Sequence, residues 1–362
     1  MVGWSLTMLL GHEVRSMLRW SKEVEMNRKL SVLTVTVILL LGPAILLPVD
    51  LVLAQSAKIK MANGSSPPIL DSITPYVAVE AGIFKKYGLD VEMVEFRGDN
   101  VLTTAMVAGN INICSNVGAT SAMVSASKGA KIRLWIVPQP VTPYHFIARK
   151  EAGTTLKALA GKTVAVSGIG AISYHIPRII MERSGVDPEK LKYVVAGSNA
   201  DRFKALLSGK VDATVVSTIE AAKLSSYPEI IDLVTVAKVV PEIPFTFGMV
   251  REDFIQKEPE TMYKLAKAMI EANRWIATNK TGTVQIAAKV IPDETPEVLS
   301  KAYDQADPHL WGLNGDISEA SYKFTSDFLV KVGFMTEPLP YEKFFERRFV
   351  DRALKELGRK QP

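Results

Sequence analysis

Two stretches of this chain, one hundred residues apart, share one pattern. The first reads Ala105-Met106-Val107-Ala108-Gly109-Asn110-Ile111-Asn112, and the second reads Ala205-Leu206-Leu207-Ser208-Gly209-Lys210-Val211-Asp212. In each, an apolar helix end is followed by a glycine suited to a helix C-terminus and then by the start of an apolar strand. Because the two stretches align without a gap, we expect the chain to contain two structurally similar halves.

The same order of elements surrounds both stretches. In the first half we expect helices over 74–81, 100–108 and 119–127 and strands over 58–62, 91–96, 111–114 and 132–137. In the second half we expect helices over 173–184 and 199–207 and strands over 162–166, 191–195 and 211–216. Strands that alternate with helices are typical of an α/β fold with a mostly parallel sheet. The sequence therefore predicts two lobes, each a mixed, mostly parallel sheet flanked by helices, with a ligand cleft between them.

After the second half, the chain returns to the first. The proline-containing stretches 142–147 and 241–248 are the expected hinges, and further helices are expected at Met262 to Ile270, 295–306, 317–332 and 341–357. We expect an N-terminal extension with a signal peptide at 1–54, lobe one at 55–146 plus 248–362, and lobe two at 147–247. A length of 362 residues suits two lobes better than one core.

The composition argues against several classes of protein. With 48% hydrophobic and 22% charged residues, the body is expected to be globular. The net charge of +5 is not gathered into a long basic run, which argues against a nucleic-acid partner. A lone cysteine, Cys114, excludes an internal disulfide and a cysteine-rich zinc site, and the four histidines lack metal-binding spacing. We therefore expect no metal and no cofactor.

The N-terminal segment has the pattern of an export signal. The basic pair Arg28-Lys29 precedes an uncharged stretch at 30–49, and Val52-Leu53-Ala54 provides a small-residue cleavage pattern. We expect translation to start at Met26 and cleavage to occur before Gln55, with an uncleaved membrane anchor as the alternative. In both cases the body is expected to lie in the periplasm. No cysteine follows the apolar stretch closely, so a lipid anchor is not expected.

Two further segments resemble those of a known family. Ala81-Gly82-Ile83-Phe84-Lys85-Lys86-Tyr87-Gly88-Leu89-Asp90-Val91-Glu92 and Leu159-Ala160-Gly161-Lys162-Thr163-Val164-Ala165-Val166 resemble segments of the periplasmic solute-binding proteins of ABC importers. The resemblance is to the group that binds sulfonates, taurine, nitrate or thiamine precursors, and it covers residues 57 to 335. It implies a two-lobed, type II fold that closes on a small solute, which we interpret as anionic. The implied partners are ABC permease subunits in the inner membrane, and the implied state is a monomer.

Polar loops at the expected strand ends are the candidate ligand contacts. Hydroxyl groups and backbone N–H groups ahead of a helix can hold an oxyanion, although they also occur in ordinary capped turns. The family implies ligand contacts in these loops, and the candidate ligand-binding residues are Ser65, Ser66, Arg97, Ser115, Asn116, Val117, Gly118, Gly170, Ala171, Ile172, Ser173, Asn199, Ser217, Thr218 and Thr246. The Gly168-Ile169-Gly170 stretch lacks the third glycine and the later acidic residue of a dinucleotide-binding motif.

Other polar residues leave two interpretations open. Glu220 could contact a cationic part of a ligand or lie in solvent at a helix start, and Arg178 and Tyr174 could contact the ligand or the protein. His145 is interpreted as structural. Since no nucleophile and base have useful spacing, the sequence favours a binding protein over an enzyme. The alternatives are an enzyme on the same fold that acts on a small heterocycle or menaquinone precursor, and a sensory ligand-binding domain.

Overall fold

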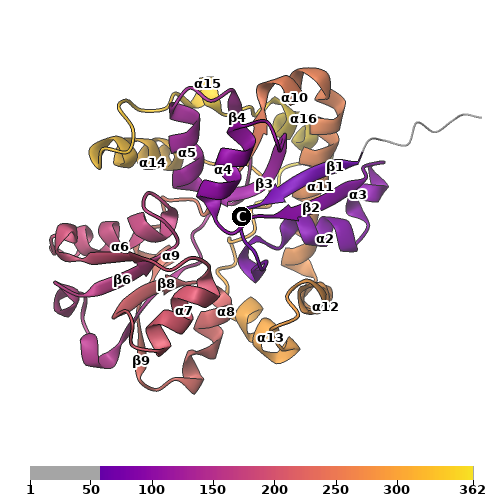
Figure 1. The fold of residues 1–362 in the computed structure, drawn as a ribbon. Helices are drawn as coiled ribbons and strands as arrows, with labels where there is room; N and C mark the ends of the chain where they lie inside the picture. Colours follow the sequence, from indigo (N-terminus) through magenta and orange to yellow (C-terminus); the bar gives the residue numbers. More distant parts are fainter. Residues whose placement is uncertain (1–57, 362) are drawn as a thin grey trace, which may run out of the picture. The chain divides into compact units, whose positions relative to one another are not determined.

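Two five-stranded mixed sheets form the framework of residues 58–361, which are the residues that the computed structural model describes (Figure 1). The predicted signal segment, the predicted start at Met26 and the predicted cleavage site before Gln55 lie outside these residues. The prediction of two mixed sheets flanked by helices is confirmed. We call each sheet with its flanking helices a lobe, the first lobe being the one that contains the first strand. The exact lobe limits within the chain remain a prediction.

The two sheets have the same topology. The first has the order β2-β1-β3-β10-β4 and the second the order β7-β6-β8-β5-β9. In both, the second strand pairs in parallel with its two neighbours, and the fourth pairs antiparallel with both of its neighbours. The strands are β1 (Ile59–Asn63), β2 (Val91–Glu95), β3 (Ile113–Gly118), β4 (Ile132–Gln139), β5 (His145–Arg149), β6 (Thr163–Val166), β7 (Lys192–Val195), β8 (Ala213–Val216), β9 (Ile230–Thr235) and β10 (Thr246–Arg251).

Helices cover both faces of each sheet. They are α2 (Thr74–Glu80), α3 (Ile83–Lys86), α4 (Asp99–Val107), α5 (Ala119–Ser127), α6 (Ile172–Arg183), α7 (Asn199–Leu207), α8 (Thr218–Lys223), α9 (Val236–Val239), α10 (Glu252–Lys257), α11 (Pro259–Thr278), α12 (Lys280–Val290), α13 (Pro296–Gln305), α14 (Glu319–Lys331), α15 (Tyr341–Phe344) and α16 (Arg348–Leu357). Within residues 58–361, no helix is both long enough and apolar enough to cross a bilayer.

Successive residues of a strand pack into different cores. Ala62 and Leu134 join the core beneath α4 and α5, whereas Met61 and Trp135 join the core beneath α2 and α11. This division follows from the pleat of a strand, which points neighbouring side chains to opposite faces of the sheet. Because both faces are covered, the strands read as nearly continuous apolar runs in the sequence.

The repeated glycine pattern has the same structural role in both lobes. Gly109 follows α4 and Gly209 follows α7, with φ angles of 84° and 71° that favour glycine. Arg251 of β10 donates to a carbonyl in the last turn of α4 at 3.2 Å, and Arg149 of β5 donates to one in α7 at 3.3 Å. Each antiparallel strand thus supplies a cation to the C-terminus of the helix beside it.

Some elements differ from the sequence-based expectation. The stretch from Ser115 to Gly118 is not a loop but the end of β3, because its backbone pairs with β1 and β10. Strands β5 and β9 and helix α12 were not predicted. Strand β5 lies within a stretch interpreted as a hinge, and its pairing partners come from segments about 65 to 90 residues later in the chain.

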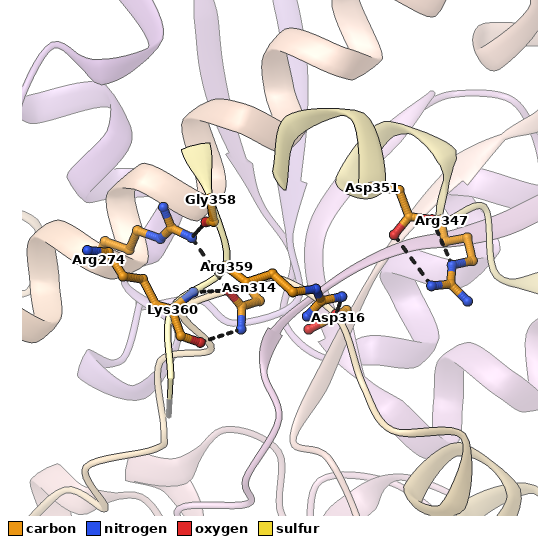
Figure 2. A network of polar contacts seen from close by, with 8 residues as sticks. All are labelled: Arg274, Asn314, Asp316, Arg347, Asp351, Gly358, Arg359 and Lys360. Carbon is orange, nitrogen blue, oxygen red and sulfur yellow. Dashed lines mark hydrogen bonds and ion pairs between the residues drawn. The ribbon is translucent and has the colours of Figure 1, made fainter. Parts of the chain in front are cut away.

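The C-terminal segment is hydrogen-bonded to α11 and to the loop before α14, as Figure 2 shows. Arg274 of α11 donates to the carbonyls of Leu313 at 2.8 Å and Gly358 at 2.6 Å. The side chain of Asn314 both donates to and accepts from the backbone of Lys360, at 2.9 Å in each case. These contacts hold the segment after α16 against lobe one.

Segments that follow β10 also contact lobe two on two sides. Helix α13 packs against α8, where the Lys223 ammonium lies 2.6 Å from the Glu294 carboxylate. On another side, Phe328 of α14 packs edge-on against His175 of α6, with ring centroids 5.4 Å apart. The two lobes are therefore connected by packed helices as well as by the two chain segments that lead into β5 and β10.

We expect Asn273→Ala to lower the free energy of unfolding by about 2–4 kcal/mol, as measured by urea denaturation. Asn273 is buried in α11, where it donates to the carbonyls of Pro138 at 2.8 Å and Gly312 at 2.9 Å and accepts from Thr74 at 2.6 Å. Removing the amide leaves buried polar groups without partners. The control Asn110→Ala, at an exposed position, should change stability by less than about 0.5 kcal/mol. Equal effects of the two variants would contradict the prediction.

Candidate ligand-binding cleft

A cavity lies between the two lobes, with about 650 Å³ of empty space when the part open to solvent is included. Its walls are formed by the carboxyl ends of β1 and β3, the start of α4, the loops after β6 and β7, and the start of α7. Ligands of open α/β sheets bind beyond the carboxyl ends of parallel strands. The topology therefore brings the expected binding edges of both sheets to one cavity.

Many of the candidate residues lie together in this cavity. Those that line it are Ser65, Ser66, Arg97, Asn116, Val117, Gly118, Ile172, Asn199 and Thr246. They come from both lobes, and the loop after β1 faces the first turn of α7 across the cavity. Their role in ligand binding remains a prediction.

Other candidate residues bond to the protein instead. The Ser115 hydroxyl donates to the carbonyl of Ala62 at 3.2 Å within the first sheet. The Ser173 hydroxyl accepts from the N–H of Ser167 at 2.9 Å and closes the turn after β6. Ala171 is buried beside that turn, and Gly170 lines a separate groove beside α4 and α5.

The last two candidates lie at the start of α8, away from the cavity lining. Ser217 donates to the carboxylate of Glu220, and Thr218 donates to Asp71 of lobe one at 2.6 Å. Glu220 is buried, so the interpretation of it as a solvated carboxylate is wrong. Burial raises the pKa of its side chain, and the Ser217 hydroxyl opposes this.

The remaining lining residues were not among the candidates. They are Asn63, Gly64, Ile69, Ser72, Gly98, Asp99, Tyr144, Ser167, Gly197, Ser198, Arg202 and Phe245. A signal for two of them was present in the sequence. Asp99 begins α4 and Arg202 lies in the first turn of α7, and these helices are the repeated elements that start one hundred residues apart.

Arg202 places a positive charge in the lobe-two wall. Its side chain is 1% exposed, and Nε, Nη1 and Nη2 donate to the carbonyls of Val215 and Gly197 and to Asn199 Oδ1, at 2.6 to 3.3 Å. Among residues 58–361, no carboxylate lies within ion-pair distance of this guanidinium. The carboxylates of Asp99 and Glu220 are near enough for the charge of Arg202 to lower their pKa values, but neither pairs with it directly. A buried cation without a direct partner favours an anion beside it.

Asp99 places a carboxylate in the lobe-one wall, against two glycines. A Cβ atom at Gly118 would lie 2.4 Å from one Asp99 oxygen, and a Cβ atom at Gly64 would lie 2.7 Å from the other. Only glycine at positions 64 and 118 leaves room for this carboxylate. Burial raises the pKa of Asp99 to about 6, and the Gly118 N–H and the charge of Arg202 oppose that rise.

The residues with two open interpretations have protein partners. Nδ1 of His145 lies 2.6 Å from the Asp232 carboxylate, and Arg178 pairs with Glu189 and lies over the ring of Tyr174. None of these side chains is in the cavity lining.

Cys114 and His175 lie in the protein core. Cys114 is buried in β3, where burial raises the pKa of its thiol to about 12. His175 is buried, and burial lowers its pKa to about 3. Within residues 58–361, no three His, Cys, Asp or Glu side chains are placed to hold a metal ion.

Comparison with known proteins now places the chain in a family. A family model described as NMT1/THI5 like matches residues 70–281, more than half of the chain, and the chain belongs to this family. YtlA, a proposed binding protein of Bacillus subtilis (strain 168), is 21% identical over 78% of this chain and 86% of its own length.

Solved structures show the same fold. The periplasmic nitrate-binding protein NrtA from Synechocystis PCC 6803 superposes with a TM-score of 0.68 at 16% identity, over 83% of this chain and 88% of NrtA. The ligand-binding component of an ABC-type import system from Staphylococcus aureus, solved with zinc bound, gives 0.67 at 16% identity, over 82% and 98%. The fold of this chain is therefore that of the periplasmic binding proteins.

A buried carboxylate links the lobes beside the cavity. Asp71, between β1 and α2, accepts from the Thr218 hydroxyl at 2.6 Å and from the Thr218 N–H at 3.3 Å. Burial raises the pKa of Asp71 to about 7, and the nearby charge of Glu220 adds to the rise. At neutral pH, the Asp71 carboxyl group in this contact between the lobes is therefore close to its pKa.

We expect the stability difference between the wild-type protein and Asp71→Asn to change with pH. Because the folded pKa of about 7 lies above the ordinary value of 3.8, the stability that protonated Asp71 contributes is complete below pH 3.8 and is lost as the pH rises through 7. From pH 4 to 8, the wild type should lose about 2–4 kcal/mol relative to the variant in urea denaturation. Asp90→Asn, at an exposed position, should show no such trend. A constant difference would show that Asp71 does not titrate in this window.

Proposed function

We propose that this chain is the extracytoplasmic substrate-binding component of an ABC importer, which captures a small solute when its lobes close. The observation that carries the proposal is the cavity between the two lobes, lined by polar groups from both strand edges. A site divided between two lobes couples ligand binding to their relative position, since only the closed form makes all the contacts. The family membership and the fold of NrtA support this function.

The residues in the cavity favour binding over catalysis. In the described part of the chain, the lining contains no histidine and no cysteine. The serines that line it therefore lack a neighbouring imidazole base of the kind that activates a hydroxyl nucleophile. We accordingly propose that the protein is not an enzyme.

An anionic group on the solute is supported by the lobe-two wall. Arg202 is a buried cation in the first turn of α7, and the N-terminus of that helix lines the cavity at Ser198 and Asn199. Arg97 adds an exposed guanidinium on the lobe-one side. Arg202 and the start of α7 in lobe two, with Arg97 across from them, give the cavity positive charge that suits a carboxylate, a sulfonate or nitrate.

The partners and location follow from the same proposal. We propose that the mature protein acts in the periplasm as a monomer, after cleavage of the signal segment or held by it as an anchor. It would deliver the solute to permease subunits in the inner membrane. The Staphylococcus aureus protein of the same fold, a component of an ABC-type import system, supports the choice of partner.

A thermal-shift screen of the purified protein tests this function. The panel contains nitrate, alkanesulfonates, carboxylates and pyrimidines, and a ligand at about 100 times its dissociation constant should add about 2.7 kcal/mol of stability. Ile172→Trp, which places a large ring in the cavity lining at the start of α6, should abolish the shift. Ile169→Trp, in the loop before that helix, lies outside that lining and should preserve it. Product formation, or a panel without any stabilising compound, would contradict the proposal.

A further inference from the structure

The lobe-one wall presents hydrogen-bond acceptors to the cavity, in contrast to the cationic wall of lobe two. The Asp99 carboxylate lies between Gly64 and Gly118, and the Asn63 side chain lies at the end of β1, beside the first of these glycines. Both residues line the cavity. The two walls therefore differ in charge and in the kind of hydrogen bond that they offer.

The orientation of the Asn63 amide is fixed by a chain of hydrogen bonds. The Tyr76 hydroxyl donates to Glu95 at 3.0 Å, so its oxygen is left to accept from Asn63 Nδ2, also at 3.0 Å. The same Nδ2 donates to the carbonyl of Ser65 at 2.9 Å. Since both N–H groups of the amide are used, the oxygen is the atom that remains for another partner.

The Asn63 oxygen has no partner within residues 58–361. The side chain is 1% exposed, and Oδ1 is buried without a hydrogen bond. A buried acceptor without a donor is costly. Of the eight buried side-chain nitrogen and oxygen atoms that have no partner in residues 58–361, the Asn63 oxygen is the one whose residue lines the cavity. An N–H group of a ligand in the cavity would satisfy it.

The guanidinium donors of Arg202 in the opposite wall are already used within lobe two. Arg202 directs Nε, Nη1 and Nη2 to oxygens of its own lobe, so it contributes mainly its charge to the cavity. An anion in the cavity would be attracted by this charge while offering nothing to the acceptors across from it. The unfilled hydrogen-bonding capacity of the site is therefore on the lobe-one side.

We propose that Asp99 and Asn63 recognise an amino group, so that the solute is an amino-bearing small molecule, and a zwitterion where it also carries the anionic group. This proposal rests on the proposed solute-binding function and adds a specificity-determining pair to it. An ammonium or an amino group has several N–H donors and can serve a carboxylate and an amide oxygen together. The bond to the carboxylate is charge-assisted, which makes Asp99 the stronger contact of the two.

Calorimetry with matched pairs of compounds that differ by one amino group tests this proposal. The pairs are 2-aminoethanesulfonate with ethanesulfonate, β-alanine with propionate, and 2-aminopyridine with pyridine. We expect the amino member of at least one pair to bind about tenfold tighter or more than its partner. Asp99→Asn should remove most of that preference, while the exposed control Asp90→Asn leaves it unchanged.

A second variant keeps the result independent of a general loss of stability. Tyr76→Phe removes the oxygen that holds the Asn63 amide in place, so the preference for the amino compound should fall although both cavity residues remain. Tyr76 is a positioning residue, and the ratio of the two affinities reports its effect.

The outcomes separate this proposal from the function on which it rests. Tighter binding of the amino-free members, or a preference that Asp99→Asn leaves intact, would overturn the recognition of an amino group and leave solute binding standing. Binding of no member of any pair, together with a flat thermal-shift panel, would overturn the proposed function and this proposal with it.

Discussion

Tyr144 packs against Phe245 where the chain crosses between the two lobes, and this contact constrains how the lobes meet at the cavity. The two rings meet edge to face with centroids 5.0 Å apart, and each lies just before a strand that enters the middle of a sheet, β5 or β10. The chain passes between lobes at this point in both directions. Because both rings also line the cavity, the crossing point and the candidate site are one place. A change in the angle between the lobes must therefore change the cavity.

The local sequence pattern predicts much of the fold. The strands that it fails to predict are those that form through pairing with distant parts of the chain. The helix, glycine and strand at 105–112 and again at 205–212 form the same unit in both lobes, as their sequences indicate. Strands β5 and β9 were missed because their pairing partners are remote and half of β9 is only partly buried. A short strand of this kind carries no periodicity that separates it from a loop.

In the candidate cleft, too, some residues could be predicted from the local sequence and others only from the tertiary structure. Loop composition together with the family resemblance led to Ser65 and Asn116, which line the cavity. Arg202 and Asp99 were not found, because a charged residue in the first turn of a helix is ordinarily solvated and nothing local says that a second lobe covers it. Their opposite charges become informative only when the two helix starts face one cavity. The charged residues that would contact a ligand are therefore identified by the folded arrangement of the lobes and not by the composition of the loops.

The contacts between the lobes differ in the free energy that is needed to break them. On one flank, Ile219 of α8 is buried in the same apolar core as Leu299 of α13, and Asp71 bonds to Thr218 beside them. Near the cavity, the Thr120 hydroxyl bonds to the carbonyl of Gly170 at 3.2 Å. Exposing a buried side chain such as isoleucine costs about 1.5–3 kcal/mol, whereas losing one neutral hydrogen bond to water costs about 1 kcal/mol. Because α14 also packs Phe328 against α6 on another flank, a large separation of the lobes exposes apolar surface on either flank. The single hydrogen bond of Thr120 near the cavity is less costly to break.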